Sequence, residues 1–266
     1  MSAAPRGPIL ALDSSTNVGS VAVGDASGLF AETVRNVAAG HSSGLLPAAE
    51  EAMRAAGLSP RELTAVVVGA GPGSFTGLRI AAATAKGVVQ ALGIPLFAYS
   101  GLLAAACSGW GADRPVCALF DARRRDVYAA CYSVVGRRSS VIGRERTDAD
   151  PTGTDVPGGA VEGAVEVLLP PTALSVDEVI ERWRGDEPPL FAGEGAVLHR
   201  EELERELGAR VMPPHLGLPR ASALLWLATR APELGAVADA ATWEPEYVRA
   251  SGAERIAAER RSGGGA

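Results

Sequence analysis

Aromatic side chains are scarce in this sequence of 266 residues: Phe, Tyr and Trp make up 5% of it, whereas hydrophobic residues make up 47%. The core must therefore be built mainly from Ala, Val and Leu. This hydrophobic content excludes an intrinsically disordered chain. The length suits one large domain or two smaller ones.

The sequence also has few cysteines and no net positive charge. The three cysteines, Cys107, Cys117 and Cys131, are too few and too widely spaced for a metal motif or a disulfide framework, which favours a reducing, cytoplasmic location. The net charge of -6 argues against a protein that holds nucleic acid mainly through its own phosphate contacts. No apolar run reaches the roughly 18 residues that a membrane-spanning helix needs, so no membrane contact is expected.

The first part of the chain predicts a mixed α/β lobe. Hydrophobic runs and turn residues predict an antiparallel meander of three strands. Helices and parallel strands then alternate, which is typical of a mixed sheet with helices on its faces. The predicted strands cover residues 9–12, 20–23, 29–34, 65–68 and 94–98, and the helices cover 43–56, 76–92 and a stretch from Leu102 to Cys107.

Strands predicted at 116–121 and 127–134 begin a second, similar unit. The order of elements resembles the duplicated ribonuclease-H-like fold of the actin, hexokinase and Hsp70 superfamily. We therefore expect an N-terminal lobe over 1–110 and a C-terminal lobe over 111–266. The second lobe is predicted to hold an irregular insertion at 136–171, with a strand at 165–169, and a flexible tail at 257–266. Its further elements are predicted at 176–183, 190–192, 200–207 and 221–231.

A glycine-rich segment from Gly71 to Ile80 joins a buried strand to a helix. Glycines allow positive φ angles and close approach of other groups, and the free amides at a helix start favour an anion. The segment lacks the Gly-Lys-Ser/Thr ending of a P-loop. Two interpretations stay open: a structural turn, or a ligand contact through Gly71, Gly73 and Thr76.

Five segments in a fixed order carry a resemblance to a known family. They are residues 13–16 (Asp-Ser-Ser-Thr), 41–47, 71–80, 121–128 (Asp-Ala-Arg-Arg-Arg-Asp-Val-Tyr) and 245–249 (Pro-Glu-Tyr-Val-Arg). Together they are similar to the TsaB (YeaZ) family, whose members are non-catalytic relatives of the threonylcarbamoyl transferase TsaD. The resemblance extends over about residues 9 to 255, and the stretch 136–171 matches no part of it.

The resemblance implies that the catalytic machinery has been lost. Catalytic relatives carry a His-x-x-x-His pair that can hold a metal, and here Ser100 and Ala104 stand in its place. The second phosphate loop of the superfamily needs small residues, where this chain has Arg123 and Arg124. We therefore expect no catalytic residue, no metal and no cofactor. What is expected to remain is a vestigial nucleotide site whose residues are Asp13, Ser14, Gly71, Gly73 and Thr76.

The segment from Asp121 to Asp126 has two open interpretations as well. It is either a solvated hairpin with local ion pairs, each worth about 1 kcal/mol or less, or a surface that contacts a partner or tRNA. Its three consecutive arginines and two carboxylates fit both interpretations.

The helix predicted over 76–92 is apolar nearly all round, which a surface helix of a single domain should not be. Small residues on it let another helix approach closely. The resemblance implies that this helix and the one over 43–56 form a bundle with TsaD, and a homodimer when TsaD is absent. The predicted contact residues are Leu45, Ala49, Met53, Arg79, Ala81, Ala85 and Val88.

Two functions follow. The first is a partner subunit that activates TsaD, with TsaE supplying ATP-dependent turnover, in the complex that transfers a threonylcarbamoyl group to the adenosine beside the tRNA anticodon. The chain would then reach tRNA through the complex. The alternative is a stand-alone ATP-binding phosphotransferase or threonylcarbamoyl transferase, with Asp13 as its metal ligand or general base.

Overall fold

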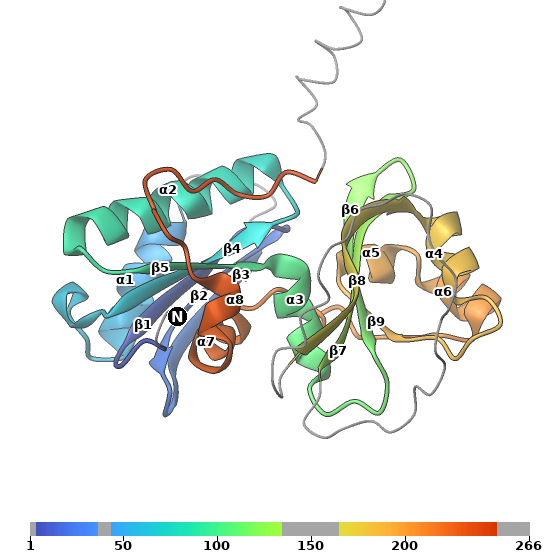
Figure 1. Cartoon of the computed structure of the whole chain (residues 1–266), viewed down its shortest axis with the longest axis horizontal. Helices are drawn as coiled ribbons and strands as arrows, with labels where there is room; N and C mark the ends of the chain where they lie inside the picture. The colour runs from blue at the N-terminus through green and yellow to red at the C-terminus, as the bar shows by residue number, and fades with distance from the viewer. Residues whose placement is uncertain (1–3, 37–43, 135–164, 249–266) are drawn as a thin grey trace, which may run out of the picture.

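The chain folds into two lobes, each built on a five-stranded mixed sheet (Figure 1). This computed structural model describes residues 4–36, 44–134 and 165–248.

The first sheet has the strand order β3-β2-β1-β4-β5. Strands β1 to β3 form the predicted antiparallel meander, and β4 and β5 run parallel to β1. Alternate residues of β1 face opposite sides: Leu10 and Leu12 pack under helices α1 and α2, while Ile9 and Ala11 belong to the hydrophobic cluster on the other face of the sheet. The elements are β1 (Ile9–Asp13), β2 (Val18–Asp25), β3 (Gly28–Asn36), α1 (Leu45–Ala55), β4 (Ala65–Gly71), α2 (Phe75–Leu92) and β5 (Leu96–Ser100).

The second sheet repeats this plan. Its order, β8-β7-β6-β9-β10, has the same pattern of two antiparallel and two parallel pairings. The repeat confirms the predicted duplicated ribonuclease-H-like fold. Its elements are β6 (Val116–Arg123), β7 (Asp126–Val134), β8 (Val165–Ser175), α4 (Val176–Trp183), β9 (Leu190–Ala192), α5 (Glu194–Leu198), α6 (Arg200–Leu207) and β10 (Arg210–Val211).

Each half ends in a helix that packs on the sheet of the other half. Helix α3 (Gly101–Ala106) closes the first half and lies against β6 and β7, and α7 (Ala221–Arg230) closes the second and lies against β1 and β2. Both helices enter one hydrophobic cluster that continues from sheet to sheet. The lobes are therefore joined by a shared core, because burying apolar surface from both sides is the main favourable contribution to folding.

After α8 (Pro232–Gly235), residues 236–248 return over the first lobe; we call them the C-terminal strap. The amide of Val237 donates to the carbonyl of Leu96 at 3.2 Å, and the amide of Glu246 donates to that of Ala70 at 2.8 Å. The strap runs beside α2 (Figure 1). The division at residue 110 stays our proposal for the two lobes, with α7, α8 and the strap packed on the first.

Most element boundaries agree with the sequence to within a few residues. Helix α2 begins after Ser74, whose Oγ accepts a hydrogen bond from the amide of Gly77 at 3.3 Å, and it ends at Gly93 in the left-handed conformation. The predicted insertion is too long at its end, because residues 165–171 belong to β8. Residues 136–164, the tail 257–266 and His41 lie outside the described residues.

Three short elements, α5, α8 and β10, were not predicted. Among the described helices, none is long and apolar enough to cross a membrane.

Candidate functional site

The loop that follows β1 is buried, although all four of its residues are polar. Asp13, Ser14, Ser15 and Thr16 are at most 5% exposed. The Asp13 Oδ1 atom accepts hydrogen bonds from the Ser15 amide at 3.0 Å and from Ser15 Oγ at 2.8 Å, while Oδ2 has no hydrogen-bond partner in the described residues. Burial raises the pKa of Asp13 to about 7, against the opposing effect of the Ser15 hydrogen bonds.

The glycine-rich loop closes directly onto this polar loop. Ser14 Oγ donates to the carbonyl of Gly77 at 2.8 Å, and the amide of Ser74 donates to the carbonyl of Ser15 at 2.6 Å. A Cβ atom at Gly73 would lie 2.1 Å from the Ser15 carbonyl oxygen, and one at Gly77 would lie 1.9 Å from that of Ser14. These glycines therefore let two loops of the chain touch, which favours the structural-turn interpretation of the motif.

The structure brings only part of the predicted nucleotide site together. Asp13, Ser14 and Gly73 meet at the loop contact. Gly71 is buried instead against the strap, because a Cβ there would lie 2.8 Å from the carbonyl oxygen of Glu246. Thr76 is exposed on the first turn of α2. The five residues therefore do not converge on one point.

A carboxylate from the second lobe approaches the end of the polar loop. Glu194, the first residue of α5, accepts a hydrogen bond from the amide of Asn17. Burial raises the pKa of Glu194 against that hydrogen bond, and the negative charge of Asp121 raises it further. A phosphate placed here would meet two acidic groups. This role of Glu194 was not predicted from the sequence.

Ser100 and Ala104, which were compared with the histidine pair of catalytic relatives, both belong to regular secondary structure. Ser100 ends β5, and Ala104 is fully buried in α3. Across residues 4–36, 44–134 and 165–248, no three His, Cys, Asp or Glu side chains are grouped as metal ligands.

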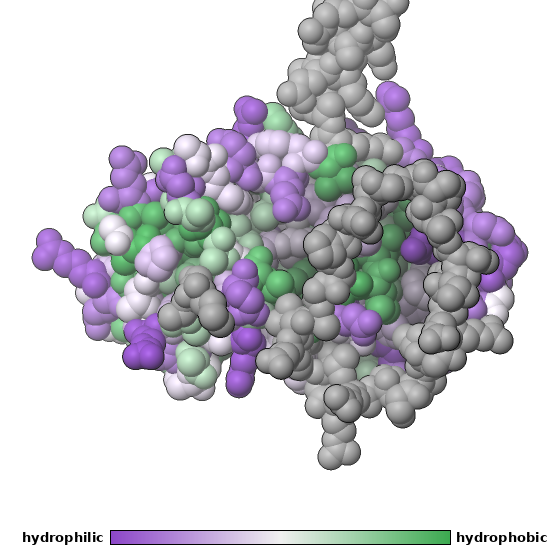
Figure 2. Space-filling view, viewed as in Figure 1, coloured by the Kyte–Doolittle hydropathy of each residue, from purple (hydrophilic) through white to green (hydrophobic). Residues whose placement is uncertain are grey.

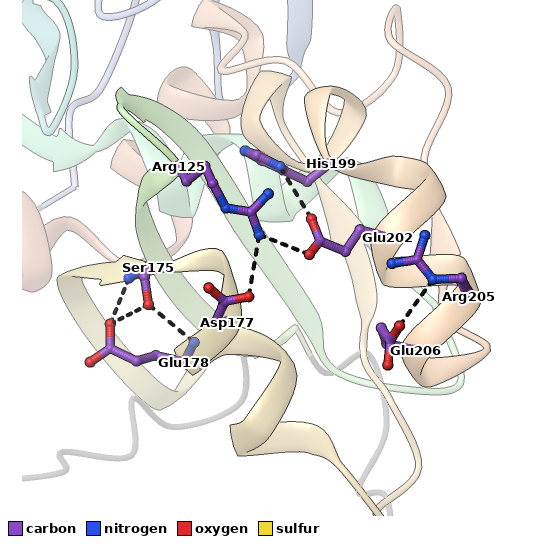
Figure 3. Close-up of polar contacts among 8 residues, drawn as sticks. All are labelled: Arg125, Ser175, Asp177, Glu178, His199, Glu202, Arg205 and Glu206. Atoms are coloured by element: carbon purple, nitrogen blue, oxygen red, sulfur yellow. Dashed lines mark hydrogen bonds and ion pairs between the residues drawn. The ribbon is translucent and has the colours of Figure 1, made fainter.

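The β6–β7 hairpin is held by its last arginine. Arg123, Arg124 and Arg125 all adopt left-handed conformations, with φ angles of 67°, 58° and 66°. The Arg125 guanidinium contacts Asp177 at 3.2 Å and Glu202 at 2.8 Å, as Figure 3 shows. Arg123 and Arg124 are exposed and form no ion pair with any described residue. The solvated-hairpin interpretation therefore accounts for Arg125 and leaves the other two arginines unexplained.

The predicted contact residues on α1 and α2 are mostly on the wrong face. Leu45, Ala49, Met53, Ala81 and Ala85 are at most 7% exposed and pack in the chain's own core under the first sheet. They cannot reach another subunit unless that core opens. Arg79 is exposed and Val88 is half-buried, so these two stay predicted contact residues.

On the opposite side of α2, the described residues leave several small or apolar residues exposed. We call Arg79, Ile80, Ala83, Gly87, Val88 and Ala91 the outer face of α2. Ala83, Gly87 and Ala91 are exposed, and a Cβ at Gly87 would meet no atom within 4 Å. Figure 2 shows hydrophobic residues gathered over the C-terminal half of α2 and the strap beside it. Another helix could approach this face closely.

An exposed aromatic cluster lies at the N-terminal end of the outer face. The Arg79 guanidinium carbon is 3.9 Å from the ring centroid of Phe75, and the rings of Phe75 and Tyr247 are 5.3 Å apart. Each ring is 38% exposed. Aromatic residues and arginine are the types enriched at the energetic centres of protein interfaces.

We expect the variant Asp13→Asn to gain stability relative to the natural chain as the pH rises. The native pKa of about 7 exceeds the ordinary value of 3.8, so between these values the native state binds more protons than the unfolded state. Stability from this group is therefore lost as pH rises, by about 2–3 kcal/mol between pH 5 and pH 7. Urea unfolding of both proteins at the two pH values measures the difference, and a pH-independent difference would contradict the buried, proton-binding carboxyl.

The duplicated fold and the shared core define a protein of the actin, hexokinase and Hsp70 superfamily. A family model described as "TsaD: tRNA N6-adenosine threonylcarbamoyltransferase" matches residues 34–256. The chain belongs to this family, in its TsaB (YeaZ) branch.

Relatives and solved structures agree with this assignment. The tRNA threonylcarbamoyladenosine biosynthesis protein TsaB of Bacillus subtilis is 28% identical over 249 residues, which cover 92% of this chain and 96% of that protein. TsaB of Escherichia coli is 35% identical over 130 residues, 47% of this chain and 54% of that protein. The structure of YeaZ from Pseudomonas aeruginosa superposes with a TM-score of 0.68 at 26% identity, covering 91% of this chain and all of that one.

Proposed function

We propose that this chain is a non-catalytic partner subunit in the biosynthesis of threonylcarbamoyladenosine in tRNA, and that it acts by binding TsaD. Membership of the TsaB branch supports the role in this modification. The observation that carries the partner role is the outer face of α2: apart from Arg79 its residues are small or apolar, and the described residues leave Ala83, Gly87 and Ala91 exposed.

The closed loop pair supports the non-catalytic part of the proposal. The glycine-rich loop occupies the space beside the polar loop, and Glu194 holds the amide of Asn17. Activation of TsaD would then come from contact alone, with TsaE joining the assembly to supply ATP-dependent turnover. We also propose that the same outer face pairs two copies of the chain when TsaD is absent, since exposed apolar area favours association.

Light scattering during size-exclusion chromatography tests the partner role. When the chain is mixed with TsaD, we expect one species to elute that contains both proteins. Its molar mass should equal that of a complex with a whole number of copies of each subunit. Elution of two separate species at micromolar concentration would contradict the proposal.

One observation favours the alternative of a stand-alone enzyme. A buried carboxyl with a pKa near 7, as in Asp13, has the value that general acid–base catalysis needs. The two functions are separated by incubating the purified chain with ATP. We expect no hydrolysis above background, whereas turnover that disappears in Asp13→Asn would establish the enzyme and overturn our ranking.

A further inference from the structure

The β6–β7 hairpin has a strained backbone conformation that hydrogen bonds hold in place. Three consecutive residues with side chains adopt positive φ angles, a backbone region that costs roughly 1 kcal/mol or more per residue outside glycine. Two contacts hold it: Asp121 Oδ1 accepts the amide of Arg123 at 2.7 Å, and the Arg125 carbonyl accepts the amide of Val176 at 3.0 Å.

Ion pairs between Arg125 and two helices of the second lobe also hold the tip of the hairpin. Asp177 and Glu202 come from α4 and α6, two helices of the second lobe, and both bind the Arg125 guanidinium (Figure 3). These carboxylates raise the pKa of Arg125, so its charge is fixed. Arg125 therefore has a structural role, and the hairpin holds Arg123 and Arg124 at a defined position on the surface.

Arg123 and Arg124 form no ion pair with another residue that the structure describes. The chain has a net charge of -6, and Arg184 and Arg205 of the same lobe lie beside Glu181 and Glu206. Arginine presents a planar fork of donors that matches the oxygens of a phosphate. Asparagine or glycine would adopt the same left-handed backbone at lower cost, so the fold alone does not explain arginine at these two positions.

The base of the hairpin lies close to a contact between the lobes. Asp121 at its base acts on Glu194, which contacts Asn17 of the first lobe. In Figure 1 the hairpin rises at the same edge of the molecule as the N-terminal end of α2 and the end of the strap. Next to this contact, the negative charges of Glu194 and Asp121 disfavour a phosphate, so an anion that contacts these arginines is better placed on the outer surface.

We propose that Arg123 and Arg124 contact backbone phosphates of tRNA when the chain is assembled with TsaD. The inference rests on the proposed function, because tRNA is reached through the complex. The contact supplies position and affinity without reading sequence, as phosphate contacts do. It also reconciles an acidic chain with a role in tRNA modification, since two local charges suffice for an auxiliary contact.

The double variant Arg123→Asn/Arg124→Asn tests the proposal, because asparagine removes both charges and tolerates the left-handed backbone. Arg184→Asn/Arg205→Asn is the matched control, since it removes two exposed arginine charges elsewhere on the same lobe. Each protein is assembled with TsaD and TsaE, the complex is confirmed by light scattering, and tRNA binding is measured by filter retention at several KCl concentrations. ADP binding to the chain alone is measured in parallel by calorimetry.

The proposal predicts that the hairpin variant assembles normally and binds tRNA on the order of 10-fold more weakly. The slope of log affinity against log salt should become shallower by about 1.5, while the control keeps the natural affinity and slope. Normal assembly with unchanged tRNA affinity and slope would overturn this inference alone. Loss of ADP binding with unchanged tRNA binding would also overturn it, because the arginines would then serve a nucleotide. Failure of the natural chain to join TsaD would overturn the proposed function, and this inference with it.

Discussion

Replacing Gly77 by alanine is expected to lower the free energy of unfolding by about 3 kcal/mol or more. The added Cβ would lie 1.9 Å from the carbonyl oxygen of Ser14, and this neighbour is backbone in a buried loop, so it cannot rotate away. Relief requires the glycine-rich loop to separate from the polar loop, which would break the hydrogen bond from Ser14 Oγ to the Gly77 carbonyl.

The same helix provides the control. Gly87 also lies in α2, but a Cβ there would meet no atom within 4 Å. Gly87→Ala should therefore raise the free energy of unfolding by about 0.5–1 kcal/mol through helix propensity alone. Urea unfolding of the three proteins at one pH measures both effects. If Gly77→Ala were as stable as Gly87→Ala, the two loops would not be in contact in solution.

Replacing Ala83 by arginine is expected to weaken binding to TsaD by at least about 100-fold, or roughly 2.7 kcal/mol. Ala83 is exposed in the middle of the outer face of α2, where a long charged side chain would hold a partner helix away and would lose water on contact. Titration calorimetry with TsaD measures the change.

The control for this variant is Leu198→Arg, which makes a comparable change at a residue that is 63% exposed on α5 of the second lobe. It should bind TsaD as the natural chain does. Ala81→Arg provides a contrast: Ala81 is fully buried, so that variant should lose its fold as well as its partner. Equal binding by Ala83→Arg and Leu198→Arg would remove the outer face of α2 from the interface.

The local features of the fold could be predicted from the sequence because local chemistry determines them. Helix α2 begins after Ser74, whose side chain caps it, and ends at Gly93, which adopts a left-handed conformation. Both residues are visible in the sequence as helix boundaries. The crossing of α3 and α7 onto opposite sheets could not be predicted in this way, because it depends on which surfaces remain to be covered after each sheet has formed.

The face of α2 was missed for a related reason. Ala81 and Ala85 face the core, whereas Ala83 and Gly87 face outward. All four are small residues, so the sequence shows no difference in hydrophobicity between the two sides of the helix. Glu194 was missed because its partner, Asn17, is far away in the sequence and joins it only when the lobes pack. Charged residues at the hairpin were visible, but which arginine is anchored depends on α4 and α6.

The central claim is that this chain supports tRNA modification without performing the chemistry. The most direct test is to combine it with TsaD, TsaE, ATP, the threonylcarbamoyl donor and unmodified tRNA, to leave out each protein in turn, and to quantify threonylcarbamoyladenosine by mass spectrometry of the digested tRNA. We expect little product when this chain is omitted, restoration by the natural chain but not by Ala83→Arg, and none from this chain without TsaD. Modification of tRNA by this chain without TsaD, or full modification in its absence, would contradict the account.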